Sequence, residues 1–244
     1  MHEWIFLAGI VFVAGVIHGL IGIGYSIVLV SVLVATGRGI ASSTMISMIT
    51  AGFCQVIIMY KLRGRMVFSA VWPLIVGAVF ALPVGLFVLH KWGGAPWMRQ
   101  VLGGFVAVVA CWLLAMPRSP SIDRKPRRLL GVGAGVLSGL GAGLFNIGGP
   151  TAALYTYSRP VPLDSAKASI QWFFIAATIY RLAITYGGQM VTWRETLDGL
   201  AAAPAVVAGT LLGMAVASRV RPWLLRRAVY ALLVLIGLKL CLWP

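Results

Sequence analysis

Two apolar stretches of this chain are interrupted by glycines at their centres and then resume without a charged residue. One is GLGAGLFNIGGPTAALYTY at 139–157, and its earlier counterpart is GVIHGLIGIGYSIVLV at 15–30. A glycine in the middle of a helix costs about 1 kcal/mol. Inside a membrane, the backbone groups freed by such a break must also find partners. We therefore interpret the two breaks as functional sites within an otherwise helical chain.

Apolar runs of about 20 residues recur along the whole length, which is typical of helices that cross a bilayer. The 244 residues are 60% hydrophobic and 10% charged, whereas soluble domains carry roughly 25% charged residues. This deficit argues against the alternative of a soluble all-α protein. The net charge of +15 would suggest nucleic acid in a soluble protein. Here we expect no nucleic-acid partner, because basic cytoplasmic loops orient membrane spans.

We expect ten apolar helical segments separated by short loops. Their expected ranges are 4–20, 24–36, 41–60, 66–89, 98–116, 129–144, 148–158, 164–186, 194–217 and 224–243. The sharpest change of composition is the polar, basic stretch at 117–128, PRSPSIDRKPRR. We interpret it as a cytoplasmic linker loop between a first membrane repeat, 1–116, and a second, 129–244. The N-terminus lacks the basic region of a signal peptide, so we expect its apolar run to be retained.

The two halves repeat at a shift of 124 residues, which indicates a duplication. The shift aligns the glycine breaks, and without a gap it also pairs several later positions. The pairs are Gly15 with Gly139, Gly19 with Gly143, Ile23 with Ile147, Gly24 with Gly148, Ser47 with Gln171, Gly64 with Gly188, Gly85 with Gly209 and Met116 with Leu240.

Charge predicts that the halves are inverted. The loop at 61–65 is basic and its second-half equivalent, 185–189, is uncharged, whereas 219–227 is more basic than its equivalent, 91–99. Basic loops mark the cytoplasmic side, so each repeat crosses the membrane an odd number of times. The broken stretch must then contribute an even number of crossings. Its arms, of 17, 13, 16 and 11 residues by these ranges, are short against the roughly 20 residues of a full span.

These constraints predict the fold class: an all-α polytopic membrane protein with two inverted five-segment repeats. Each repeat would open with a glycine-broken re-entrant helical hairpin, and both termini would be periplasmic. This topology puts 14 Lys and Arg residues inside and four outside. The competing topology treats each broken stretch as one kinked span, but it places a basic or a bare loop on the wrong side.

The hairpin tips are the expected binding site for an anion. Gly148, Gly149 and Pro150 allow a sharp turn into a new helix, and the free N–H groups and dipole of such a helix favour negative charge. Two such ends at mid-membrane would form a dry pocket. The tip residues that we assign to it are Gly22, Gly24, Tyr25, Ser26, Asn146, Gly148, Gly149, Pro150 and Thr151. The alternative role, close helix packing by small residues, is the one we accept for Gly15 and Gly139.

Four further polar residues within apolar segments are candidates for the same substrate site. His18 either carries a proton or binds the anion as imidazolium; the alternative is a neutral ring hydrogen-bonded to backbone. Ser47 and Gln171 either line the transport path or form interhelical hydrogen bonds. Arg181 either extends outward to water or attracts anions at the outer mouth.

The chain shows no sequence pattern of an enzyme. All five acidic residues are expected at helix ends or in loops, which argues against a cation carrier and leaves His18 as the buried candidate for proton coupling. The three cysteines have neither disulfide nor metal-ligand spacing. We therefore expect no cofactor, no metal and no catalytic residues.

The whole chain resembles the TauE/SafE sulfite exporter family, also called the TSUP family. The resemblance is carried by Gly19, Gly22, Ile23 and Gly24 in the first half and by Gly-Leu-Phe-Asn-Ile-Gly-Gly-Pro at 143–150 in the second. It implies transport of a sulfur-containing anion, such as sulfite, a sulfonate or sulfoacetate, across the bacterial inner membrane. We thus expect a secondary transporter that works by alternating access. An anion channel and a non-transporting membrane assembly protein are the alternatives, and the oligomeric state stays open.

Overall fold

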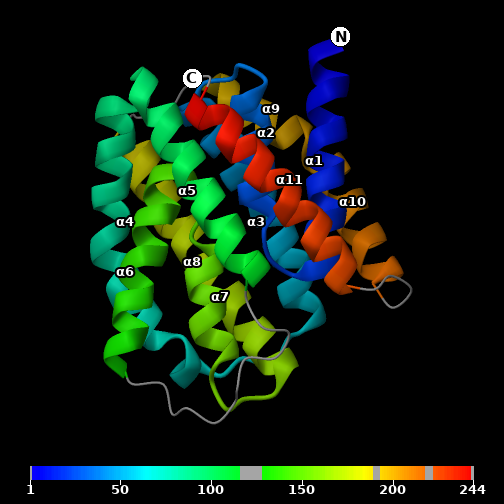
Figure 1. The fold of residues 1–244 in the computed structure, drawn as a ribbon. Coiled ribbons are helices and arrows are strands. Elements are labelled where there is room, and N and C mark those ends of the chain that lie inside the picture. The colour runs from blue at the N-terminus through cyan, green and yellow to red at the C-terminus, as the bar shows by residue number, and fades with distance from the viewer. Residues whose placement is uncertain (1, 116–127, 189–192, 218–221, 243–244) are drawn as a thin grey trace. The chain divides into compact units, whose positions relative to one another are not determined.

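A computed structural model describes residues 2–115, 128–188, 193–217 and 222–242. The expected linker loop at 117–128 therefore lies almost wholly outside the described residues. Within the described ranges the chain is helical and contains no strand, which confirms the all-α prediction (Figure 1). The helices are α1 His2–Ile21, α2 Tyr25–Ala35, α3 Ile40–Lys61, α4 Trp72–Trp92, α5 Pro96–Ala115, α6 Arg128–Phe145, α7 Gly149–Tyr157, α8 Leu163–Gly187, α9 Trp193–Ala201, α10 Ala203–Val216 and α11 Pro222–Leu242, and a 3-10 turn, η1, spans Phe68–Ala70.

The expected segments correspond closely to these helices. The fourth segment differs because its helix starts at Trp72 after the turn η1, and not at residue 66. The ninth segment forms two helices, α9 and α10, with a 41° bend between them. Pro204 is the second residue of α10. Because proline has no N–H to donate and its ring clashes with the carbonyl four residues earlier, it interrupts the helix at this point.

Among the residues that the structure describes, six helices (α1, α3, α4, α5, α6 and α8) are long and apolar enough to cross a membrane, and the bent pair α9–α10 would make a seventh span. A polytopic membrane protein is thereby confirmed. The arms of the broken stretches are unequal. The first arms, α1 and α6, have 20 and 18 residues, whereas α2 and α7 have 11 and 9. The expectation of generally short arms is wrong for α1 and α6, both of which reach spanning length.

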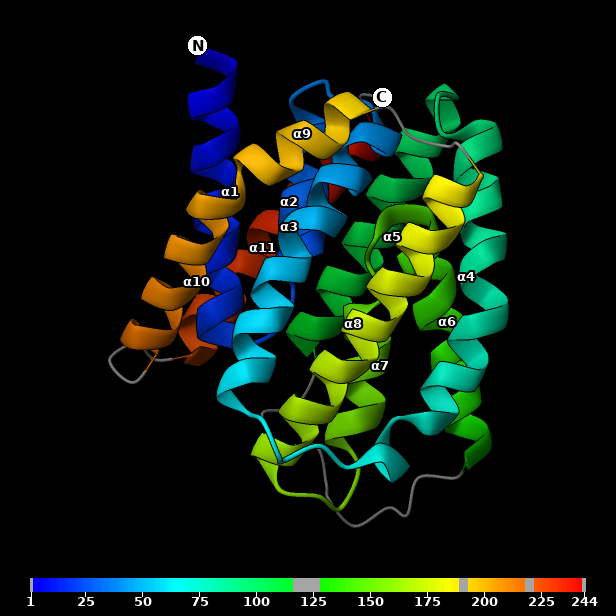
Figure 2. The same ribbon diagram turned by 180° about the vertical axis from the view of Figure 1, so that it is seen from behind.

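The helices form two compact units, which do not coincide with the sequence halves. Unit 1 comprises 1–54, 91–118 and 193–244, and unit 2 comprises 55–90 and 119–192. In unit 1 the first helix of the first half, α1, packs along α10 from the second half (Figure 2). In unit 2 the first helix of the second half, α6, packs against α4 from the first half. Each half therefore contributes its fourth segment, α4 in the first half and α9–α10 in the second, to the unit that contains the other half's hairpin.

Glycines bring these helix backbones together. A Cβ atom added at Gly19 would meet the backbone of Thr210, Gly213 and Met214. One added at Gly143 would meet the backbone of Leu82, Gly85 and Leu86. Such small-residue contacts let membrane helices approach closely.

The same contacts correct the register of the repeat. Gly19 and Gly143 are 124 residues apart, but their partners Gly213 and Gly85 are 128 apart. The structural equivalent of Gly85 is therefore Gly213 and not Gly209. The four extra residues amount to about one helical turn and precede Gly213 in the second half.

Helices α5 and α11 of unit 1 run in opposite directions and form a reciprocal contact (Figure 1). A Cβ atom added at Gly103 would lie 2.6 Å from the oxygen of Gly237 and 2.9 Å from the nitrogen of Cys241. One added at Gly237 would lie 2.7 Å from the oxygen of Gly103 and 2.8 Å from the nitrogen of Ala107. The contact is the same when each residue of α5 is exchanged with the residue 134 positions later in α11. This is the pattern expected of two helices related by a two-fold axis.

Candidate functional site

The first glycine break lies between α1 and α2 in unit 1. Gly22 and Gly24 have φ values of 82° and 96°, in the left-handed region that glycine adopts without strain. The N–H of Gly22 donates to the oxygen of His18 at 2.6 Å. The chain then reverses, because Leu7 near the start of α1 and Leu33 near the end of α2 line the same cavity. The two helices therefore form a hairpin, and Gly24 precedes α2 without contributing a side-chain cap.

His18 and Tyr25 flank this tip from the two arms of the hairpin. His18 is 4% exposed and Tyr25 is 2% exposed. Their rings are nearly perpendicular, at 83°, with centroids 6.0 Å apart. Among the described residues, neither nitrogen of His18 has a hydrogen-bond partner, whereas the hydroxyl of Tyr25 lies next to the side chain of Thr50. The alternative of a His18 ring bonded to backbone is therefore not observed.

The two other candidates in unit 1 are the serines Ser26 and Ser47. Ser26 is the second residue of α2 and is half-buried. Ser47 is fully buried on α3, and its backbone oxygen lies 3.4 Å from the hydroxyl of Thr50, which donates to the oxygen of Ile46 at 2.6 Å.

The second glycine break lies between α6 and α7 in unit 2. Asn146 has a φ of 59°, and asparagine is one of the few residues other than glycine that tolerate this region. The N–H of Asn146 donates to Ala142 O at 3.0 Å, and that of Ile147 to Gly141 O at 2.9 Å. These bonds satisfy the last carbonyls of α6 while the chain turns away from the helix axis.

Helix α7 begins at Gly149 with Pro150 as its second residue. The hydroxyl of Ser138 on α6 donates to the oxygen of Gly148 at 2.7 Å and ties the two arms together. The hydroxyl of Thr151 lies 3.4 Å from the same oxygen, so it contributes to the turn. A Cβ atom added at Gly131, near the start of α6, would meet the ring of Tyr155 near the end of α7. The second break is therefore also a hairpin.

Arg181 lies inside unit 2 and not at its surface. It is 3% exposed, so the expectation that it extends outward to water is wrong. Its Nη1 donates to the oxygen of Ala142 at 2.5 Å, in the last turn of α6 before the tip. None of the carboxylates that the structure describes pairs with it, and its Nε has no partner. Gln171, also on α8, is 1% exposed.

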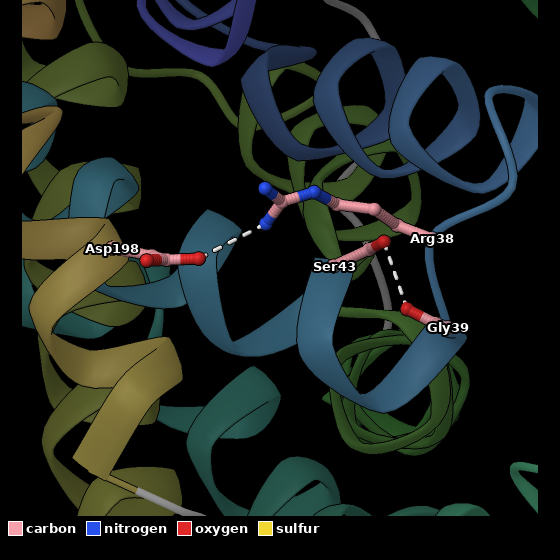
Figure 3. A network of polar contacts seen from close by, with 4 residues as sticks. All are labelled: Arg38, Gly39, Ser43 and Asp198. Atoms are coloured by element: carbon pink, nitrogen blue, oxygen red, sulfur yellow. Dashed lines mark hydrogen bonds and ion pairs between the residues drawn. The ribbon is translucent and has the colours of Figure 1, made fainter. Parts of the chain in front are cut away.

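An ion pair at the other end of unit 1 was not predicted. Arg38, in the loop after α2, donates to Asp198 on α9 at 3.1 Å (Figure 3). Asp198 is buried in the second turn of α9. Both residues line a cavity of about 480 Å³, together with Arg194, Glu195 and apolar residues of the first hairpin. The partners are 160 residues apart, so no local sequence signal could have paired them.

The described residues also contain a second ion pair and no candidate metal centre. In unit 2 the guanidinium of Arg65 pairs with the carboxylate of Asp164. No three His, Cys, Asp or Glu side chains among the residues that the structure describes lie close enough to hold a metal ion.

Comparison with known proteins assigns the family. The sulfite exporter TauE/SafE family matches residues 7–240. A similar protein is the probable sulfite/organosulfonate exporter TauE of Cupriavidus necator, which is 26% identical over 225 residues, covering 90% of this chain and 87% of the relative. No solved structure matches the chain. The match over nearly the whole chain shows that this protein belongs to the TauE/SafE sulfite exporter family.

Proposed function

We propose that this chain is a secondary transporter that moves a small sulfur-containing anion across the bacterial inner membrane by alternating access. The anion would be bound at the tips of the two broken helical hairpins. The observation that carries the proposal is the pair of hairpins itself: each unit contains a glycine-lined turn from which a short helix begins without a side-chain cap. Helix N-termini of this kind bind anions through their N–H groups and dipole.

Family membership makes the chain a multi-pass membrane transporter and not an enzyme. The name of the relative from Cupriavidus necator refers to sulfite and organosulfonates and to export. We extend this substrate class to the present chain as part of the proposal.

The charges of unit 2 favour an anion. Arg181 is a buried cation without a described carboxylate partner, and it donates to a carbonyl of the tip. An ionisable residue buried within a membrane protein costs free energy and is a candidate for function. A transported anion near the tip would offset that cost.

The proposed topology is that of inverted repeats with re-entrant hairpins and periplasmic termini. Three observations support it: the charge bias of the loops, the exchange of the fourth segments between the halves, and the reciprocal antiparallel contact of Gly103 and Gly237. Inverted repeats provide two related conformations, in which the site opens to one side or to the other.

Binding of sulfite and methanesulfonate to the purified protein tests the site, with Asn146→Ala and Gly149→Leu as variants. Both should weaken binding at least tenfold, because one alters the turn and the other fills the tip. Gly133→Leu is the matched control: Gly133 lies exposed on α6, with no atom within 4 Å of an added Cβ. Binding by both tip variants as tight as that of the wild type would refute the assignment. Counterflow of labelled sulfite in liposomes separates a carrier from a channel, which shows none.

A further inference from the structure

His18 is the feature of unit 1 that helix packing does not explain. Its imidazole is almost completely buried, and among the described residues both ring nitrogens lack hydrogen-bond partners. Buried polar groups are normally hydrogen-bonded, and each exception calls for an explanation. One ring nitrogen of a neutral imidazole is a donor and the other an acceptor, so this side chain retains an unused site for a proton.

His18 belongs to a buried polar cluster formed by four helices of unit 1. Besides His18 on α1, the cluster contains Tyr25 on α2, Thr50 and Cys54 on α3, and Thr210 on α10. The Cys54 thiol and the Thr210 hydroxyl are 3.1 Å apart, and Thr50 and Cys54 lie near the Tyr25 hydroxyl. The last three members are 0% exposed. This His18 cluster adjoins the glycine turn from which α2 begins.

The cluster is not needed to build a hairpin of this type. At the 124-residue shift, His18, Tyr25 and Thr50 correspond to Ala142, Gly149 and Phe174. The second hairpin thus folds with apolar residues or glycine at these positions. The buried imidazole of His18 without a hydrogen-bond partner destabilises the first hairpin, and no packing role in the hairpin requires it, which points to a functional role.

No fixed charge among the described residues neutralises a protonated His18. Helix α2 contributes Tyr25, α3 contributes Cys54, and the described residues of α10 include no titratable side chain. Helix α11 also packs on α1. Its described titratable groups are the exposed Arg227, the buried Tyr230, Lys239, which donates to Ala35 O, and Cys241, which donates to Gln100 O. A charged imidazolium here would therefore lack a carboxylate partner and be costly.

We propose that His18 is the proton-binding site through which this protein couples anion transport to proton movement. The inference rests on the proposed function, because the missing counter-charge is supplied by the anion at the adjoining tip. A proton from water on one face adds to a ring nitrogen, and the N–H bond breaks again when the proton returns to water on the other face. The anion stabilises the imidazolium and the imidazolium stabilises the anion, and this mutual effect is equal in both directions. One proton therefore accompanies each anion.

Proton and sulfite fluxes in liposomes test the coupling. Full-length wild type, His18→Gln and His90→Gln are reconstituted with a pH-sensitive dye inside, and proton and radiolabelled sulfite movements are measured together. His90 is exposed on α4, so the same substitution there serves as the matched control. Protons carried by bisulfite itself form a background common to all three proteins. We expect His18→Gln to bind and exchange sulfite more weakly and to carry about one proton fewer per sulfite moved, and His90→Gln to equal the wild type.

Equal proton-to-sulfite ratios in the wild type and His18→Gln would overturn the inference and leave the proposed transport function intact. Failure of the wild type to bind or transport sulfite and methanesulfonate would instead overturn the proposed function. A second measurement does not depend on the folding of a variant. Calorimetric binding of methanesulfonate to the wild type, in buffers of different ionisation heats, should report uptake of about one proton. Binding without proton uptake would also refute the coupling site.

Discussion

Alanine substitution should destabilise the protein strongly at one of two adjacent glycines in the tip of the second hairpin and hardly at all at the other. A Cβ atom added at Gly148 would lie 2.6 Å from the oxygen of Ser138 and 2.8 Å from its Oγ. At Gly149 the nearest atom would be Cζ of Phe174, at 3.6 Å, an ordinary contact. The φ of Gly148 is −94°, which any residue adopts. The penalty of Gly148→Ala is therefore steric and does not arise from backbone strain.

The structure allows an estimate of that penalty. The Gly148 contact must lengthen by roughly 0.8 Å to reach 3.4 Å, the beginning of ordinary van der Waals distance. Overpacking of this kind costs about 1–3 kcal/mol. The same movement stretches the 2.7 Å hydrogen bond from Ser138 to the Gly148 oxygen, which contributes about 1 kcal/mol. We expect Gly148→Ala to destabilise the protein by roughly 2–4 kcal/mol and Gly149→Ala to change stability by less than about 0.5 kcal/mol.

Thermal unfolding of the two variants in the same detergent is the direct assay. The difference corresponds to a decrease in melting temperature on the order of 5–15 °C for Gly148→Ala. If sulfite binds at this tip, Gly148→Ala should also bind it more weakly at temperatures where the protein remains folded. Equal melting temperatures for the two variants, or a lower one for Gly149→Ala, would refute the packing that we describe.

Three further predictions concern buried charge and topology. Arg181→Met should leave the melting temperature within about 3 °C of the wild type, since apolar replacement of a buried charge is often neutral, but it should weaken sulfite binding at least tenfold; unchanged binding would contradict a role for the guanidinium. In a cysteine-free background, Arg63→Cys should react with an impermeant maleimide only in opened cells and Lys91→Cys in intact cells, and the reverse pattern would exclude the proposed orientation. Because Asp198 is largely buried, Arg38→Ala should destabilise the protein by about 1–3 kcal/mol in thermal unfolding, and Asp198→Ala, which leaves the half-buried Arg38 unpaired, by less.

The helices could be predicted from the sequence because their signals are local. Hydropathy located the ten segments, and the glycine and proline residues at 146–150 located the second turn. The bend before α10 was missed, although Pro204 in the second position of a helix is a local signal that could have revealed it.

The pairing of the helices could not be predicted in the same way. That α4 packs on α6, and α10 on α1, depends on glycine faces that are far apart in sequence. Many apolar helices in this chain offer similar faces, so a pattern of small residues does not specify the partner. An alignment of the two halves without a gap also missed the extra helical turn, which makes Gly213 and not Gly209 the equivalent of Gly85.

The residues of the candidate site could be predicted from the sequence, but the neighbours that surround their side chains could not. The sequence identified His18 and Arg181 because polar residues within apolar runs are rare. It could not show that the imidazole lacks partners or that the guanidinium lies against the backbone of the tip. Those properties depend on neighbours from other helices, such as Ala142 for Arg181.

The two units differ in the basic side chain that lies near the tip of each hairpin: His18 on α1 in unit 1 and Arg181 on α8 in unit 2. His18 corresponds to Ala142 at the 124-residue shift, and it is the oxygen of Ala142 that accepts the hydrogen bond from Arg181. The second unit thus has a permanent charge where the first has a titratable one. A transporter that is not an obligate exchanger returns through its cycle without substrate, and every unpaired charge kept buried during that step costs free energy. A histidine can release its proton before the return step and an arginine cannot. Under the proposed coupling, His18 would therefore carry a charge only while the anion is bound, whereas Arg181 would keep its charge throughout the cycle.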